Sequence, residues 1–186
     1  MEKEIKLTDG VVLLRPYGSG DVERLYQAAR ESITEMSPWM PWCHADYSIE
    51  ESRAWLELRA EAWEKGTEYE FAITDAKDGS FLGGCGLNHI DYKNRIANIG
   101  YWVRTSRTKR DVASAAARLL AQFGFKKLKL NRIEVKAAVG NKASQRVAEK
   151  IGAKREGILR NRMVVRDRVY DMVMFSLIPE DLNLNS

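Results

Sequence analysis

Cysteine and histidine are scarce in this sequence. Its 186 residues include two cysteines, Cys43 and Cys85, and two histidines, His44 and His89. The cysteines are far apart and form no C-x-x-C pair, so no disulfide framework is expected and a reducing cytoplasm is the expected environment. Two separated histidines provide no zinc-binding pattern, and we expect no metal.

Long apolar runs are also absent. No stretch approaches the roughly 18 consecutive apolar residues that a membrane-spanning helix needs. The first residues, M-E-K-E-I-K-L, lack the apolar core of a secretory signal peptide. We therefore expect a soluble cytoplasmic protein with no membrane partner.

The sequence does contain an ordinary globular composition with a small excess of positive charge. Hydrophobic residues make up 45% and charged residues 30%, and the formal net charge is +4. This length and balance predict that residues 1–186 form one domain around a single core. The positive charge would suit an anionic ligand. Nucleic-acid binding would rest on charge alone, because the sequence has no recognisable nucleic-acid motif.

Hydrophobic periodicity predicts elements in the order β-α-α-β-β-β-α-β-α-β-β, which indicates one α/β domain with a mixed sheet. The expected strands cover residues 11–16, 69–74, 80–89, 95–103, 133–137, 154–159 and 169–177. One helix is expected after Asp21, and one from the Ser48/Glu51 capping box to Gly66. Two more are expected over 112–123 and over 143–151, the last ending before Gly152.

A basic turn precedes the third expected helix. Helix N-termini present free N–H groups and partial positive charge, which favours phosphate binding. Four cations add to that charge within seven positions: Arg104, Arg107, Lys109 and Arg110. A pyrophosphate site and a merely solvated basic loop are equally good interpretations of this turn alone.

Asn141 and Ser144 begin the fourth expected helix. Asn141 suits the N-cap and Ser144 the N3 position, and such residues more often cap a helix than catalyse. Both, however, follow a strand end beside the first strand-to-helix junction, where ligands bind in open α/β sheets. A site role is therefore a hypothesis beside the structural one.

Three further side chains are candidates for a substrate wall. Pro41 lies between Trp39 and Trp42 and prevents a helix there. Both rings are therefore expected at the surface, at the opening of a pocket, where exposed aromatic residues often bind ligands. His89 ends its strand and could be a polar site group, although a surface imidazole is the simpler interpretation.

Several segments together resemble the GNAT superfamily of acyl-CoA N-acyltransferases, and within it the RimJ/RimL-like ribosomal-protein N-acetyltransferases. The resemblance covers nearly the whole chain. Its most specific parts are I-G-Y-W-V at 99–103, V-G-N-K-A-S-Q-R-V-A-E-K-I-G-A at 139–153, R-E-G-I-L-R at 155–160 and W-x-P-W at 39–42.

The resemblance implies a GNAT-like fold: a mixed, mostly antiparallel sheet, splayed in the middle, with helices on both faces. It implies that acetyl-CoA is the cosubstrate. Asn141 would bind its pantetheine, and Ser144 would donate a proton to the leaving thiolate. The strand that would bind the pantetheine arm is Ile99, Gly100, Tyr101, Trp102 and Val103. The turn that would cradle the pyrophosphate is Arg107, Thr108, Lys109, Arg110, Asp111, Val112 and Ala113.

The chain departs from the family pattern at two places. Asp111 occupies the position of a loop glycine, and a unit charge near pyrophosphate costs on the order of 1–4 kcal/mol, depending on the local dielectric. Asn98 and Met163 occupy the two positions where relatives often carry a glutamate base. Glu70, His89 and Asp91 remain as groups that could act through a water.

The expected reaction is direct transfer of an acetyl group to a primary amine. An α-amine of pKa about 7.7–8.0 is roughly one-tenth neutral at pH 7, whereas a lysine amine near 10.4 is under one part in a thousand neutral. A site without a strong base therefore favours a protein or peptide N-terminus. The alternatives are a small amine, such as an antibiotic or polyamine, and a degenerate domain that binds CoA or a partner without catalysis. Both a monomer and a homodimer are compatible with the sequence.

Overall fold

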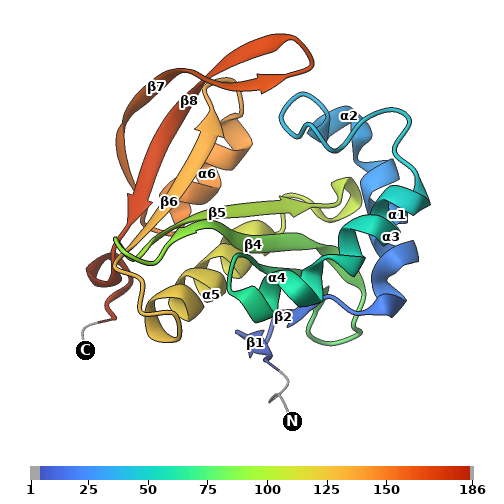
Figure 1. Ribbon diagram of the computed structural model, residues 1–186, viewed down its shortest axis with the longest axis horizontal. Helices are drawn as coiled ribbons and strands as arrows, with labels where there is room; N and C mark the ends of the chain where they lie inside the picture. The colour runs from blue at the N-terminus through green and yellow to red at the C-terminus, as the bar shows by residue number, and fades with distance from the viewer. Residues whose placement is uncertain (1–4, 185–186) are drawn as a thin grey trace.

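The computed structural model describes residues 5–184, and eight strands in this part of the chain form one sheet in the order β1-β2-β3-β4-β5-β6-β8-β7 (Figure 1). The strands are β1 (Leu7–Thr8), β2 (Val12–Pro16), β3 (Tyr69–Asp75), β4 (Phe81–Asp91), β5 (Ile96–Val103), β6 (Arg132–Ala138), β7 (Lys154–Val165) and β8 (Arg168–Leu177). Seven of the eight were predicted, six of them with small changes at their ends and β7 with a shorter extent. The short strand β1 was not.

The helices follow the predicted order with two differences. They are α1 (Val22–Glu31), α2 (Ile33–Met36), α3 (Ile49–Glu57), α4 (Arg59–Lys65), α5 (Val112–Lys126) and α6 (Lys142–Lys150), with short 3-10 turns at Ser19–Asp21, Thr105–Arg107 and Pro179–Leu182. The extra helix α2 follows α1 directly. The helix predicted to run unbroken to Gly66 is interrupted at Leu58, because the Trp55 carbonyl accepts from the Leu58 N–H and from the Arg59 side chain.

Within residues 5–184, one pair of neighbouring strands is parallel. β5 and β6 pair over Ile96–Asn98 and Arg132–Glu134, and the other neighbouring strands are antiparallel. Beyond these three residue pairs β5 and β6 diverge, as Figure 1 shows. The predicted mixed, mostly antiparallel sheet is confirmed, and its splay lies between these two strands.

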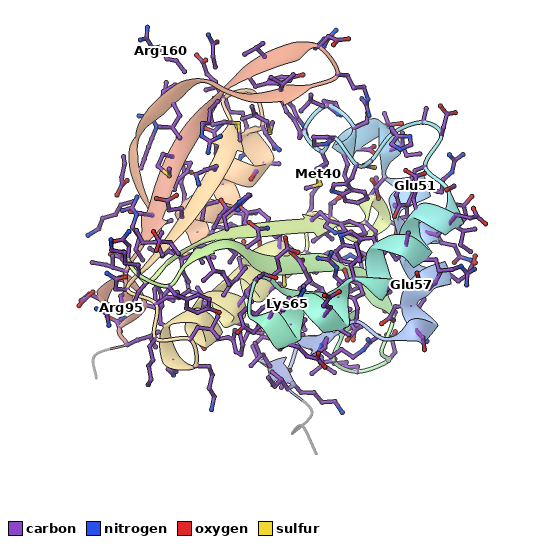
Figure 2. The ribbon with its side chains drawn as sticks, viewed as in Figure 1. Met40, Glu51, Glu57, Lys65, Arg95 and Arg160 are labelled. Carbon is purple, nitrogen blue, oxygen red and sulfur yellow. The ribbon has the colours of Figure 1, made fainter. Side chains whose placement is uncertain are left out.

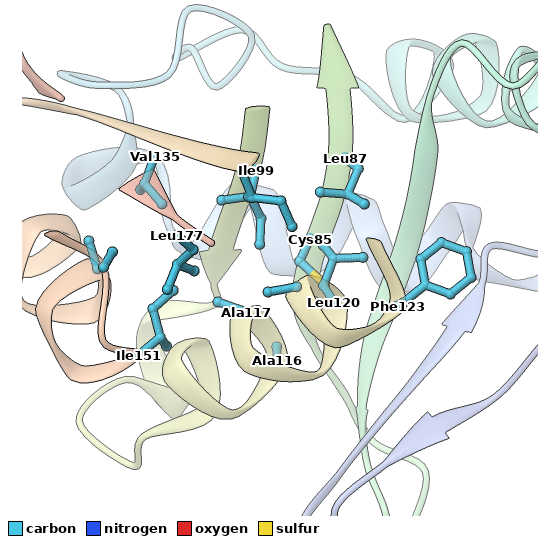
Figure 3. Packing of buried hydrophobic residues seen from close by; sticks show 14 of the residues in the cluster. Cys85, Leu87, Ile99, Ala116, Ala117, Leu120, Phe123, Val135, Ile151 and Leu177 are labelled. Atoms are coloured by element: carbon cyan, nitrogen blue, oxygen red, sulfur yellow. The ribbon is translucent and has the colours of Figure 1, made fainter. Parts of the chain in front are cut away.

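Helices cover both faces of the sheet because the central strands are apolar on both sides. In β3, Phe71 and Ile73 join the core beneath α5, whereas Ala72 packs with Leu25 and Ala28 of α1 on the opposite face. Figure 3 shows the first of these cores, with α5 residues such as Leu120 against the sheet.

The last two strands form a longer hairpin than predicted. β7 continues to Val165, where only 154–159 was expected, because a bulge at Asn161 interrupts the alternation that marks a strand. Asp171 accepts from the Asn161 N–H at 2.8 Å and holds this bulge. The tip reaches the segment before α3, where Arg166 donates to the carbonyls of Ser37 (3.1 Å) and Cys43 (2.9 Å).

Candidate active site

The divergence of β5 from β6 opens a cleft in the middle of the sheet. Beyond Asn98, β5 has no strand partner on its β6 side, so backbone groups of residues 99–103 face the cleft. Helix α6 begins across it, and Asn141 caps that helix by accepting from the Ser144 N–H at 3.1 Å. The predicted capping role of Asn141 is confirmed. Its binding role stays a prediction.

The Tyr101 side chain crosses the cleft to Ser144. Its hydroxyl donates to the Ser144 carbonyl at 2.9 Å and lies 3.2 Å from Ser144 Oγ. Burial raises the pKa of Tyr101 to about 12, so the phenol is protonated at neutral pH. The sequence predicted only a backbone role for Tyr101. Strand divergence explains the contact, because it lets a long β5 side chain reach α6.

A cationic turn closes one end of the cleft at the N-terminus of α5. The side chains of Lys109 and Arg110 are exposed there. Arg104, predicted to belong to this group, instead forms an ion pair with Glu31 and so does not supply a free charge. That pairing lowers the pKa of Glu31 to about 2.

The backbone of Asp111 adopts a conformation that favours glycine, the residue expected at this position of the loop. Its φ is +58°, in the left-handed region that glycine adopts freely and aspartate tolerates better than most residues. The carboxylate forms an ion pair with Lys150 of α6, and the Asp111 side chain is 73% exposed. Lys150 and solvent therefore screen the charge that the sequence places beside the phosphate turn.

A cavity of about 480 Å³ adjoins the cleft on the face of the sheet that carries α1 and α3. Gly84 and Gly100 line it without a side chain, and Gly86, on the same face of the sheet, is covered by the Glu70 carboxyl group. Figure 2 shows Met40 above β5 and Glu51 on α3, two lining residues from different elements. The aromatic lining is Tyr17, Trp42, Tyr47, Trp55, Tyr101 and Trp102.

Charged groups stand among these rings. The lining includes Glu51, Glu68 and Glu70, against the single cation Arg59. Arg59 forms an ion pair with Glu68, and its guanidinium lies 4.5 Å from the Trp55 ring centroid. Burial raises the pKa of Glu70 to about 7. The wall of the cavity is therefore largely aromatic, and its carboxylate side chains outnumber its cationic ones.

Comparison with known proteins places these features in one family. Residues 12–154 match the family model described as "Acetyltransferase (GNAT) domain". The chain belongs to the GNAT acetyltransferase family. It is accordingly an N-acetyltransferase with an α+β GNAT fold.

Two of the similar proteins have names that refer to ribosomes or ribosomal proteins. The chain is 38% identical, over 56% of its length, to YdaF of Bacillus subtilis (strain 168), named provisionally as a ribosomal N-acetyltransferase; it spans 57% of that protein. It is 25% identical to a "Ribosomal-protein-serine acetyltransferase" of Escherichia coli (strain K12), over 96% of this chain and 98% of that one. The structure resembles Mycobacterium smegmatis RimJ in complex with CoA-disulfide, with a TM-score of 0.86, 25% identity, and coverage of 97% and 88%.

The three residues predicted to contact the acceptor do not all lie in the same place. Trp42 lines the cavity, with its ring 5.5 Å from Trp102 and 38% of its surface exposed. Trp39 does not line it; it packs against the Gly140 turn and lies 5.9 Å from Tyr170, between ring centroids. His89 is exposed at a break in the β4–β5 pairing and is also outside the lining. The acceptor role of all three residues stays a prediction, and of the three only Trp42 lies in the cavity lining.

The structure also shows the surroundings of Asn98 and Met163, the two positions where a glutamate base was considered. Asn98 donates to the Asn88 side chain at 2.9 Å, and Met163 lies in β7, outside the cavity lining. Tyr17 and Tyr47 were not predicted as acceptor-site residues, and Glu70 was predicted only as one of three groups that could act through a water. The signal available for Glu70 was strand alternation: it faces away from Phe71, which is in the core.

Two absences hold within residues 5–184. No helix there is both long and apolar enough to cross a membrane. In the same residues no three His, Cys, Asp or Glu side chains are grouped so that they could hold a metal ion.

The Asp111 position provides a first prediction. Asp111→Gly is expected to tighten CoA binding about two- to ten-fold, because it removes a screened negative charge and keeps the left-handed backbone. Isothermal titration calorimetry with CoA at low and high salt would measure this. As a matched variant, Lys150→Ala should weaken binding, since it leaves Asp111 unpaired. Equal affinity of Asp111→Gly and the parent protein at low salt would contradict the prediction.

Proposed function

We propose that this GNAT enzyme transfers the acetyl group of acetyl-CoA directly to the α-amine of a protein or peptide N-terminus. One observation carries the proposal: an aromatic cavity with an acidic charge balance adjoins the cleft at Gly100–Trp102. A terminal ammonium group is a small cation, and both aromatic faces and carboxylates attract it. The names of the relatives in Bacillus subtilis and Escherichia coli support a ribosomal-protein acceptor.

Acetyl-CoA fits the cleft by its chemistry. The unpaired edge of β5 over 99–103 offers backbone groups to an amide-containing pantetheine arm, as one strand does to another. The N-terminus of α5 with Lys109 and Arg110 offers donors and positive charge to the pyrophosphate. We propose that these groups and Asn141 hold the cosubstrate, with its thioester toward the cavity.

The residues around the thioester would then act on the transfer itself. Backbone N–H groups near Tyr101 to Val103 would stabilise the oxyanion that forms when the amine attacks. Ser144 would donate a proton to the CoA thiolate as the C–S bond breaks. The Tyr101 hydroxyl holds Ser144 in place, because it contacts both the carbonyl and the hydroxyl of that residue.

A small cationic amine is a second candidate acceptor. It is favoured by the same charge balance, in which Glu51, Glu68 and Glu70 outnumber Arg59, and by the cavity volume. A polyamine or amino sugar would fit a compact acidic pocket. A peptide would need to extend out of it past Trp42.

An acceptor panel would test the proposal. Purified protein is incubated with labelled acetyl-CoA and with peptides that have free N-termini, the same peptides with blocked N-termini, polyamines and amino-sugar antibiotics. We expect transfer to free N-termini, with none to blocked peptides that keep an internal lysine. Preference for polyamines or amino sugars would favour the second candidate, and no transfer to any amine by CoA-binding protein would contradict acetyl transfer.

A further inference from the structure

We propose that Glu70 is the general base of this enzyme, accepting the proton of the acceptor ammonium directly or through one water. Three carboxylates line the cavity, and among them Glu70 is the one carried by a central strand, β3. The proposal rests on acetyl transfer to an amine and not on which amine is used.

Strand register places Glu70 on the cavity face. Glu70 pairs with Gly86 of β4, and Gly86 pairs with Gly100 of β5. Because side chains alternate along a strand, these three residues share one face of the sheet. A Cβ at Gly86 would overlap the Glu70 carboxyl group, so that group lies directly over Gly86. The carboxylate thus points across β4 toward the β5 residues that border the cleft.

An amide pair lies beside the carboxylate. The Asn88 side chain is close enough to lower the pKa of Glu70, and its carbonyl oxygen accepts from Asn98 at 2.9 Å. Asn88 and Asn98 are also opposite each other in the β4–β5 register. Asn98 cannot take a proton itself, but its hydrogen bond fixes the Asn88 side chain beside Glu70.

The surroundings of Glu70 suit a base that works near neutral pH. Burial is the main cause that raises its pKa to about 7, and the nearby Glu68 raises it further. Arg59 and the Asn88 side chain act in the opposite direction. Tyr17 and Cys85 also lie close, and burial keeps both protonated by raising their pKa values. A carboxylate with a pKa near the working pH transfers protons most effectively.

The proton balance is complete with the residues described. The ammonium gives one proton to Glu70, which passes it to solvent. The neutral amine forms the new C–N bond and, as the C–S bond breaks, its second proton leaves. That proton reaches the CoA thiolate through Ser144. The products are the N-acetylated amine, CoA thiol and one released proton.

Glu70→Gln tests the role with nearly the same side-chain shape. With an acceptor that the parent enzyme uses, kcat at pH 7 is expected to fall about 100-fold, at the lower end of general-base contributions. The limb of the kcat–pH profile near pH 7 should disappear. Glu68→Gln is the matched control: it removes a charge from the same cavity and should shift that limb to lower pH, because a neighbour that raises the pKa of Glu70 is lost.

The melting temperature of Glu70→Gln distinguishes a loss of catalysis from misfolding of the variant. Glu70 has a raised pKa in the folded state, so its contribution to stability is present below its usual value of 4.5 and is lost as pH rises through about 7. Glu70→Gln should therefore have a melting temperature that increases relative to the parent between pH 5 and pH 8. A folded Glu70→Gln with the parent kcat, or with a reduced kcat and an unchanged pH limb, would overturn the proposal. Failure of the parent enzyme itself would count against the proposed function instead.

Discussion

Replacing Gly83 with alanine is expected to lower the free energy of unfolding by about 4 kcal/mol, combining backbone strain with overpacking. Gly83 has φ of +156°, a conformation that residues with a Cβ rarely adopt. A Cβ there would overlap the Trp102 carbonyl oxygen and come within 2.9 Å of the Val103 Cα. Both are backbone atoms of β5, so neither can rotate away. Urea denaturation followed by circular dichroism would measure the loss.

Gly157→Ala is the control for this change. Gly157 lies in the same sheet, on β7, and a Cβ there would meet no atom within 4 Å. Its free energy of unfolding should stay within about 0.5 kcal/mol of the parent value, as for most surface substitutions. Equal stability of the Gly83 and Gly157 variants would show that the β4–β5 contact at Gly83 is looser than described.

Gly86→Ala is expected to reduce kcat about 100-fold, the same size as loss of a general base. The new Cβ would occupy the space of the Glu70 carboxyl group, so the carboxylate must swing away from the cavity centre. Glu70 is a flexible side chain, so the cost in stability should be smaller than at Gly83. Steady-state kinetics over pH 6–9, together with a thermal melt, would measure both effects.

A double variant makes this prediction specific to Glu70. If Gly86→Ala acts by displacing the Glu70 carboxylate, Gly86→Ala/Glu70→Gln should be no slower than Glu70→Gln alone. If the fall in kcat of the double variant is instead the product of the two single effects, Gly86→Ala acts by another route, such as narrowing of the cavity by the new methyl group. Gly157→Ala again provides the control, since it should leave the kinetics unchanged.

Local patterns predicted most of the fold. The Ser48/Glu51 capping box starts α3, Asn141 caps α6, and Gly152 follows that helix with φ of +92°. Each depends on residues within one turn of each other, which is why sequence alone could find them. The hairpin β7–β8 was underestimated because its turn residues, Arg166 and Asp167, both have positive φ without the glycine that usually marks such a turn.

The Arg104 and Asp111 predictions were limited by distant partners. Arg104 binds Glu31, which is 73 residues away, and Asp111 binds Lys150, which is 39 residues away. Neither partner could be identified from spacing. The sequence therefore overestimated the positive charge that Arg104 brings to the phosphate turn and the negative charge that Asp111 brings to it.

The sequence by itself determined the family, the α+β class and the two helix starts that border the cleft, because motifs and periodicity are properties of contiguous residues. Only the tertiary structure decided which side chains share the acceptor cavity. Residues 70 and 100 meet there, on either side of Gly86, because β3, β4 and β5 pair in one particular register. A shift of one residue would turn Glu70 into the core and remove the carboxylate from the cavity.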